Sequence, residues 1–230
     1  MQVIKTLLTL GAICGLSACA QPDASRSGLR DSVSLATKNG PVHLPQRQVE
    51  IPLSVTDVVV KVPTSLRVSE ADTYYPMADV VWRGEPRDNR LVQVSRIFNE
   101  AAARGTAGLK SGLAVIAEVE VTRFHCLTEK TRNSIGGMHS LQFKLTIREA
   151  ATGRVLDGPR LVNADVKASG GTKAIAEDYA GRTQRVVVVE RLAQVLQDEL
   201  DTLMADPSTV GLVLSSSDSR PGTLLLSAAN

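Results

Sequence analysis

LAVIAEVEVTRF, residues 113–124, and LQFKLTIR, residues 141–148, are the two stretches that decide the fold. In both, apolar residues alternate with polar ones, the period of a β-strand with one buried and one solvated face. On the solvated face, Glu118 and Glu120 can pair with Lys144 or Arg148 across the sheet, so we interpret the two carboxylates as structural and not catalytic. The apolar faces are Leu113, Val115, Ala117, Val119 and Val121, and Leu141, Phe143, Leu145 and Ile147.

Further strands are predicted on both sides of this pair. Residues 56–62 are β-branched and apolar, and Pro63 marks the end of that strand. After the turn signal Ala151-Thr152-Gly153, apolar runs predict another strand that continues to Ala168. Shorter strand candidates lie at residues 65–68 and 77–82.

Two helices are predicted from apolar residues at steps of three and four. The first covers about residues 89–103, with Asp88 as its cap, and ends at Gly105 and Gly108. The second runs without a break from Ala174 to Ala205, and Asp206-Pro207 ends it. The predicted fold class is therefore α+β, a mainly antiparallel sheet with both helices packed on one face, because consecutive strands with tight connections pair antiparallel.

The first 18 residues predict a signal peptide. Lys5 is followed by an apolar stretch and then by small residues, and this stretch is shorter than the roughly 20 residues that span a bilayer. The ending Leu16-Ser17-Ala18-Cys19 resembles the lipobox of bacterial lipoproteins. The resemblance implies cleavage between Ala18 and Cys19 and lipidation of Cys19. In that family an Asp after the Cys retains the protein in the inner membrane; Ala20 here therefore favours the outer membrane, facing the periplasm.

The rest of the chain divides by composition. Residues 19–48 are predicted to be a lipidated N-terminus and flexible tether, 49–205 a folded domain, and 206–230 a tail. The tail contains two apolar runs, residues 210–214 and 224–226, which fit an added edge strand, a partner-binding segment or a disordered chain equally well. Cys14 leaves with the signal and Cys19 is lipidated, so only Cys126 remains as a thiol, which we predict to be buried.

Composition and motifs argue against several functions. The chain of 230 residues has 26 Lys and Arg against 24 Asp and Glu and only 3% aromatic residues, which disfavours nucleic-acid binding. The three histidines, His43, His125 and His139, have no metal-ligand spacing, and no nucleophile motif is present. We therefore predict no metal, no cofactor and no enzyme activity.

Three aromatic residues in one short segment form the candidate interface. Tyr74, Tyr75 and Trp82 are followed by several arginines, and aromatic residues often anchor interfaces. The alternative interpretation places Trp82 in the core and the arginines on a solvated rim.

Residues 56–205 resemble the periplasmic auxiliary lipoproteins of ABC-type lipid transporters. The resemblance lies in residues 78–82 (ADVVW) before the first helix, Val121-Thr122-Arg123-Phe124 at the end of a strand, and residues 151–156 (ATGRVL) in a turn. It implies an α/β sandwich like the N-terminal domain of TolB and a non-catalytic accessory role.

These observations lead to three hypotheses. The first is an outer-membrane lipoprotein that docks on an envelope complex through its sheet edge or long helix, with lipid transport as the favoured pathway. The second is a regulatory or assembly lipoprotein for cell-wall synthesis or a surface structure. The third is an envelope enzyme, which requires a pocket with convergent polar groups.

Overall fold

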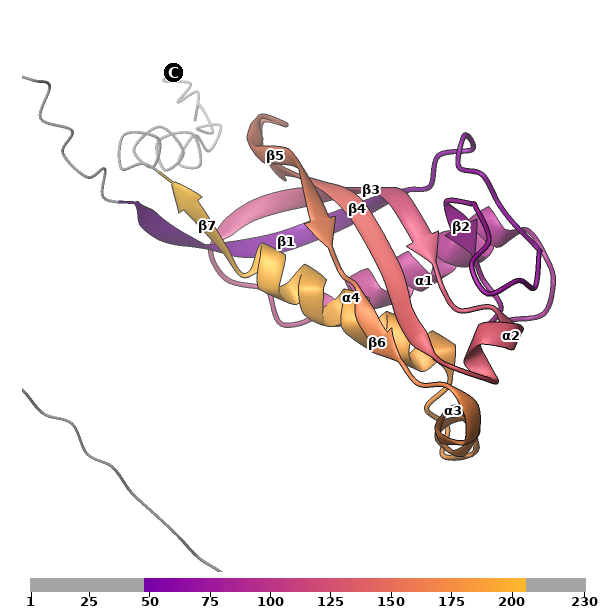
Figure 1. Cartoon of the computed structure of the whole chain (residues 1–230). Helices are drawn as coiled ribbons and strands as arrows, with labels where there is room; N and C mark the ends of the chain where they lie inside the picture. Colours follow the sequence, from indigo (N-terminus) through magenta and orange to yellow (C-terminus); the bar gives the residue numbers. More distant parts are fainter. Residues whose placement is uncertain (1–47, 206–230) are drawn as a thin grey trace, which may run out of the picture. The chain divides into compact units, whose positions relative to one another are not determined.

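The computed structural model describes residues 48–205, so the signal segment, Cys19, the tether and the tail lie outside it. The elements of this part are shown in Figure 1. Its strands are β1 (Val49–Lys61), β2 (Val80–Val81), β3 (Leu113–His125), β4 (Gly137–Glu149), β5 (Val155–Asn163), β6 (Val166–Ala168) and β7 (Thr202–Ala205). Its helices are α1 (Arg90–Gly105), α2 (Glu129–Arg132), α3 (Gly171–Tyr179) and α4 (Gln184–Leu200).

The strands form one mixed sheet in the order β5-β4-β3-β1-β7, with β2 beside β3 and β6 beside β4. The stretches 113–124 and 141–148 pair directly, with Glu120 opposite Lys144 and Val119 opposite Leu145 in the antiparallel β3–β4 ladder. The α+β class with a mostly antiparallel sheet is therefore confirmed.

One pairing in the centre of the sheet is parallel, whereas consecutive strands were expected to pair antiparallel. β1 pairs parallel with β3, with Leu53 opposite Leu113 and Val60 opposite Val119. The physical reason is α1, which lies between them in the chain and returns it to the same end of the sheet, as a parallel pair requires. Asn89, and not Asp88, caps that helix by accepting a hydrogen bond from the backbone N–H of Val92.

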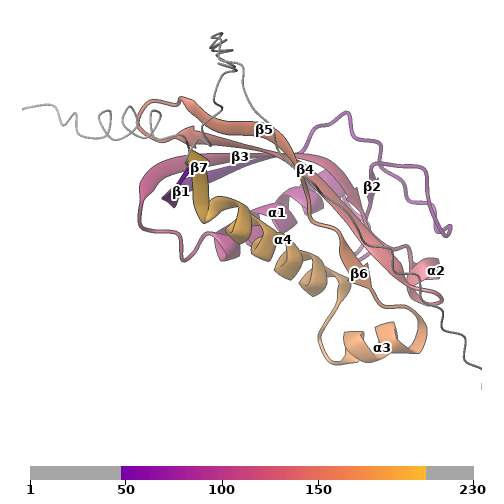
Figure 2. The ribbon, with the colours of Figure 1, turned by 60° about the vertical axis from the view of Figure 1, so that its left-hand side comes forward.

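α1 and α4 cover the same face of the sheet, as Figure 2 shows. Helix residues such as Phe98 and Leu192 are fully buried in one core with the inward residues of β3 and β4. The Phe98 ring packs edge-on against Phe143 of β4, with 5.8 Å between ring centroids. The prediction that the two main helices pack on one face is confirmed.

The prediction of one long helix from Ala174 to Ala205 is wrong. The structure has α3, a turn and α4, and the chain after α4 becomes β7. Gly181 adopts φ +80°, which a helix does not allow, and the Thr183 hydroxyl then caps α4 by accepting from the N–H of Val186. At the other end, Leu203 pairs with Ile51 of β1, so tertiary pairing overrides the helical spacing.

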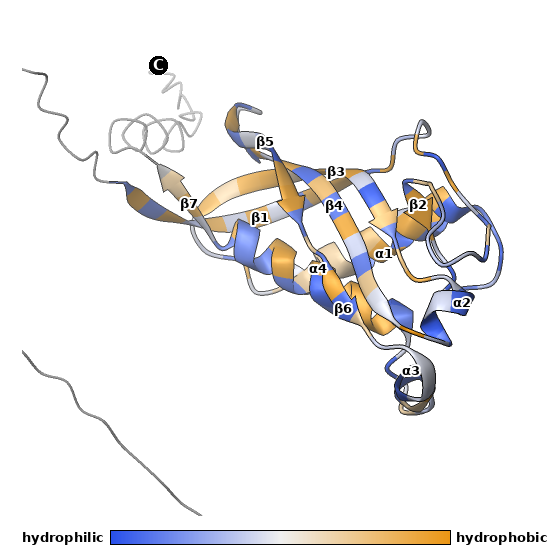
Figure 3. Cartoon of the chain, viewed as in Figure 1, coloured by the Kyte–Doolittle hydropathy of each residue, from blue (hydrophilic) through white to orange (hydrophobic). Residues whose placement is uncertain are grey.

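The outer face of the sheet carries the charged pairs predicted from the sequence. Arg148 Nε lies 2.7 Å from Glu118 Oε1, and Lys144 Nζ lies 3.4 Å from Glu120 Oε1. Figure 3 shows the alternating hydropathy along β3 and β4 that separates this face from the core. Between residues 48 and 205, no helix has both the length and the apolar character needed to cross a bilayer.

Candidate functional site

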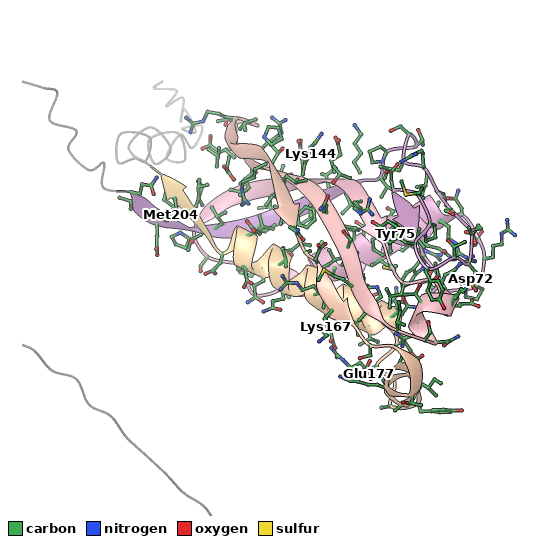
Figure 4. The ribbon with its side chains drawn as sticks, in the orientation of Figure 1. Asp72, Tyr75, Lys144, Lys167, Glu177 and Met204 are labelled. Atoms are coloured by element: carbon green, nitrogen blue, oxygen red, sulfur yellow. The ribbon has the colours of Figure 1, made fainter. Side chains whose placement is uncertain are left out.

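A groove lies at the end of the sheet where β3 ends and β4 begins. The loop before β2, the end of β3, and the segment from α2 to β4 meet here, and Figure 4 labels Tyr75 and Asp72 in this region. The groove has a volume of about 420 Å³. Its lining is mainly apolar and includes Tyr74, Tyr75, Leu127, Ile135 and Met138.

Four large apolar side chains of this groove are exposed to solvent. Tyr74 is 52% exposed, Tyr75 63%, Ile135 76% and Met138 55%. Single exposed apolar residues are ordinary, but several gathered around one hollow are typical of a site that binds a partner or an apolar ligand.

The two tyrosines are held in place by neighbouring elements. The Tyr75 hydroxyl accepts a hydrogen bond from Arg123 Nη2 at 2.7 Å, and the Tyr75 ring lies 4.6 Å from the His125 ring. The ammonium group of Lys130 lies 4.6 Å from the Tyr74 ring centroid, a cation–π contact. Rings held in this way would lose little conformational freedom if a partner bound to them.

The loop that carries the tyrosines is tied to α2 through its backbone. The Thr128 hydroxyl donates to the Thr73 carbonyl and the Thr131 hydroxyl to the Tyr74 carbonyl, both at 2.8 Å. The Asp72 carboxylate accepts from the backbone N–H of Lys130 at 2.9 Å. Residues separated by more than fifty positions in the sequence therefore form one wall.

Ile135 is positioned by a close backbone contact. Gly136 has φ +70°, and a Cβ at this position would lie 2.6 Å from the backbone nitrogen of Gly170. The turn therefore requires glycine, and it presents Ile135 to solvent at the rim of the groove.

Three of the polar side chains that line the groove are paired within the protein. His125 Nε2 donates to the Pro76 carbonyl at 3.0 Å, and the Asp165 carboxylate accepts from the N–H of Leu141 at 2.8 Å. The Ser140 hydroxyl accepts from Arg123 Nε. The arrangement therefore suits an apolar occupant.

Comparison with known proteins identifies the family. A protein-family model described as "Family of unknown function (DUF6778)" matches residues 53–214. The chain belongs to this family. Among curated proteins nothing matches. A crystal structure of protein XCC0632 from Xanthomonas campestris, of the family DUF330, is similar at a TM-score of 0.38 with 12% identity, covering 76% of this chain and 92% of that one.

Trp82 does not belong to the exposed surface of this DUF6778 chain, which removes it from the candidate interface and agrees with the alternative interpretation that it packs in the core. The side chain is fully buried and meets the Phe124 ring edge-on at 5.5 Å between centroids. Pairing of Val80 and Val81 with the end of β3 places the next residue in the core. The structure thus brings Tyr74 and Tyr75 together in the groove and separates Trp82 from them.

The arginines that follow Trp82 in the DUF6778 domain are not all exposed to solvent, as a solvated rim would require. The Arg90 side chain is 3% exposed, and its Nε lies 2.7 Å from Glu70 Oε1. Arg83 Nη1 lies 2.7 Å from Glu70 Oε2. Hydrogen bonding by Arg90 is the main reason that the pKa of Glu70 is lowered.

Ile135 and Met138 were not predicted as groove residues. Neither belongs to a periodic apolar run, so the sequence pattern does not show whether its side chain is exposed or buried. The two glycines after Ile135 were the available signal, since paired glycines mark a tight loop whose neighbours are often exposed. Cys126 is buried as predicted, and burial raises the pKa of its thiol. In the DUF6778 residues that the structure describes, no three His, Cys, Asp or Glu side chains gather as a metal site would require.

Proposed function

We propose that this protein is an outer-membrane lipoprotein, anchored through Cys19 and facing the periplasm, that acts as a non-catalytic docking component of an envelope complex. The lipobox-like segment Leu16-Ser17-Ala18-Cys19 supports the anchor. Two or more acyl chains on one residue would hold the protein on the membrane stably, since each buried methylene contributes about 0.8 kcal/mol.

The observation that carries the docking role is the exposed apolar groove around Tyr74, Tyr75, Ile135 and Met138. His125 and Asp165, which line the groove, already have hydrogen-bond partners inside the protein, so an apolar segment bound there would not deprive these two side chains of a partner. Tyrosine and methionine are both enriched at protein interfaces. A lipid-transport complex is the partner that the sequence resemblance favours, and a cell-wall or surface-structure complex is the alternative.

The anchor is tested by Cys19→Ala in the full chain, expressed with an epitope tag in a Gram-negative host. We expect the wild-type protein to incorporate labelled fatty acid and to sediment with outer membranes, and Cys19→Ala to lose the label. Cys14→Ala is the matched control and should keep both properties, because that residue lies in the part removed. A Cys19→Ala protein that still carries fatty acid would contradict the anchor.

The docking role is tested by Ile135→Glu, which places a charge on the rim of the groove. Crosslinking in intact cells followed by purification should recover a specific envelope complex with the wild-type protein and at least tenfold less with Ile135→Glu. Leu161→Glu is the control, since Leu161 is 63% exposed and lies outside the groove. Equal recovery with both variants, or no specific complex with the wild type, would contradict docking through this groove.

A further inference from the structure

A second cavity lies beside β6, α3 and the first turn of α4. It has a volume of about 240 Å³. On β4, Met138 and Ser140 line the groove, whereas His139 between them lines this cavity. Because neighbouring side chains of a strand point to opposite faces, the cavity and the groove lie on opposite faces of the sheet at this point. Binding in the cavity is therefore separate from the docking proposed above.

Basic side chains predominate in the lining of this cavity. Figure 4 labels one of them, Lys167 on β6, and the single carboxylate of the lining, Glu177 on α3. The Glu177 carboxylate already accepts a hydrogen bond from Ser169 Oγ at 2.8 Å. The four cations of the lining are Arg132, Lys167, Lys173 and Arg182.

The positive charge of the lining is only partly balanced. Three of the four cations have a carboxylate partner, but Lys167 has no ion-pair partner within residues 48–205. An anion in the cavity would supply the missing negative charge. The three existing pairs are Arg132–Asp178 at 2.6 Å, Arg182–Glu190 at 2.7 Å and Lys173–Glu177 at 4.0 Å.

Two buried side chains of the lining have a donor without an acceptor. His139 is 1% exposed, and its Nδ1 accepts from the N–H of Leu127, so Nε2 of the neutral ring carries the proton. Arg132 is 7% exposed and bonds to Asp178 and to the Ala174 carbonyl through Nε and Nη2. In the described part of the chain, neither His139 Nε2 nor Arg132 Nη1 has a partner. An acceptor bound in the cavity would satisfy both donors.

The electrostatic environment of His139 also favours an anion. Burial and, secondarily, the charge of Arg132 lower the pKa of His139 to about 4, so the ring is a neutral donor at neutral pH. The positive potential that disfavours a second proton on this ring attracts negative charge. Ser169 and Lys173 line the cavity on either side of Gly171, where α3 begins, and the helix N-terminus adds partial positive charge there.

We infer that this cavity binds a phosphate group through His139 Nε2, Arg132 Nη1 and the ammonium group of Lys167. A phosphate presents at least three acceptor oxygens in a tetrahedral arrangement, which suits donors that come from three elements, β4, α2 and β6. A planar carboxylate accepts best from donors in its own plane, such as those of a single guanidinium group. Either inorganic phosphate or the headgroup of a phospholipid would supply this chemistry.

The experiment follows the His139 ring by proton–nitrogen NMR in the full-length protein, purified in detergent at pH 7. The His139 signals are those missing from the His139→Asn variant. We expect inorganic phosphate to shift them along a saturating curve, whereas sodium chloride at the same ionic strength should not. His125 is the internal control, because it lines the groove and not the cavity.

A parallel titration with glycerophosphoglycerol, the headgroup of phosphatidylglycerol without its acyl chains, distinguishes the two sources of phosphate. Both outcomes support the cavity as a phosphate site. Tighter binding than that of inorganic phosphate assigns it to a lipid headgroup, and equal or weaker binding assigns it to the free ion.

Lys167→Gln tests the residue that has no ion-pair partner. The substitution should raise the Kd for phosphate about three- to fivefold, the effect of losing one partly exposed ion pair. Lys110→Gln is the matched control, since Lys110 is exposed and lies outside the cavity, and it should leave the Kd unchanged. Three results would overturn the inference: no saturable shift of His139 with either ligand, an equal shift with sodium chloride, or equal weakening by the two substitutions.

Discussion

Gly105 of α1 lies directly against the backbone of α4, so that a Cβ at this position would stand 2.4 Å from the carbonyl oxygen of Ala193. The two helices that cover the sheet thus approach each other at a residue without a side chain. We expect Gly105→Ala to lower the free energy of unfolding by about 1–3 kcal/mol, because the helices must move apart to admit the methyl group. Urea unfolding followed by circular dichroism measures this loss.

Gly108 is the control for this prediction, since a Cβ there would meet no atom within 4 Å. Gly108→Ala should change the free energy of unfolding by less than about 0.5 kcal/mol. Equal losses for the two substitutions would mean that the close contact of α1 with α4 does not limit packing.

Glu70 neutralises two arginines, of which Arg90 is almost wholly buried. Glu70→Gln should lower the free energy of unfolding by about 3 kcal/mol, because removing one partner leaves the Arg90 charge without compensation. Glu190→Gln is the control: it breaks the pair with Arg182, whose side chains are both about half exposed, and should cost less than about 1 kcal/mol. Similar unfolding curves for both variants would contradict a structural role of the Glu70 cluster.

We expect His139 to make the free energy of unfolding of the domain depend on pH. Burial and, secondarily, the Arg132 charge lower the pKa of His139 to about 4 from 6.5. Between these values the unfolded chain binds a proton that the folded protein does not, so the free energy of unfolding should fall as pH drops from 6.5 toward 4. The slope should reach at most about 1.4 kcal/mol per pH unit.

Urea unfolding between pH 7.5 and 4.5 measures this dependence, with His139→Asn as the comparison. In the wild type, His139 Nδ1 accepts a hydrogen bond from the backbone N–H of Leu127. An Asn side chain offers an oxygen that can accept the same bond, and Asn does not titrate. The variant should be much less sensitive to pH over this range. Identical pH slopes for the two proteins would assign the effect to other groups.

Trp82 should act as a core residue in any stability measurement. Trp82→Ala should lower the free energy of unfolding by about 3–5 kcal/mol, the range for deleting a large buried aromatic side chain. Tyr74→Ala removes an exposed ring and its contact with Lys130 and should cost no more than about 1 kcal/mol. Comparable losses would place Tyr74 in the core and contradict its role at the groove. Unfolding is followed by circular dichroism, because Trp82 is the only tryptophan in the chain.

The sequence predicted the groove only in part. Tyr74 and Tyr75 were selected for their chemistry, and both lie at the groove. Trp82 was selected for the same reason, but pairing of β2 with β3 places it in the core. Ile135 and Met138 reach the groove through the turn at Gly136, whose approach to Gly170 depends on residues more than thirty positions away.

By itself, the sequence determined the elements whose signal is local. Period-two alternation defined the inner and outer faces of β3 and β4 and their charged pairs, because neighbouring side chains of a strand point to opposite faces. The division of the last helix also has a local signal, Gly181 followed by the cap residue Thr183, which the apolar spacing alone does not reveal. Only the tertiary structure decided the parallel pairing of β1 with β3, the pairing of β7 with β1, and which aromatic residues face solvent. These features depend on contacts between segments far apart in the chain, and local periodicity carries no information about such contacts.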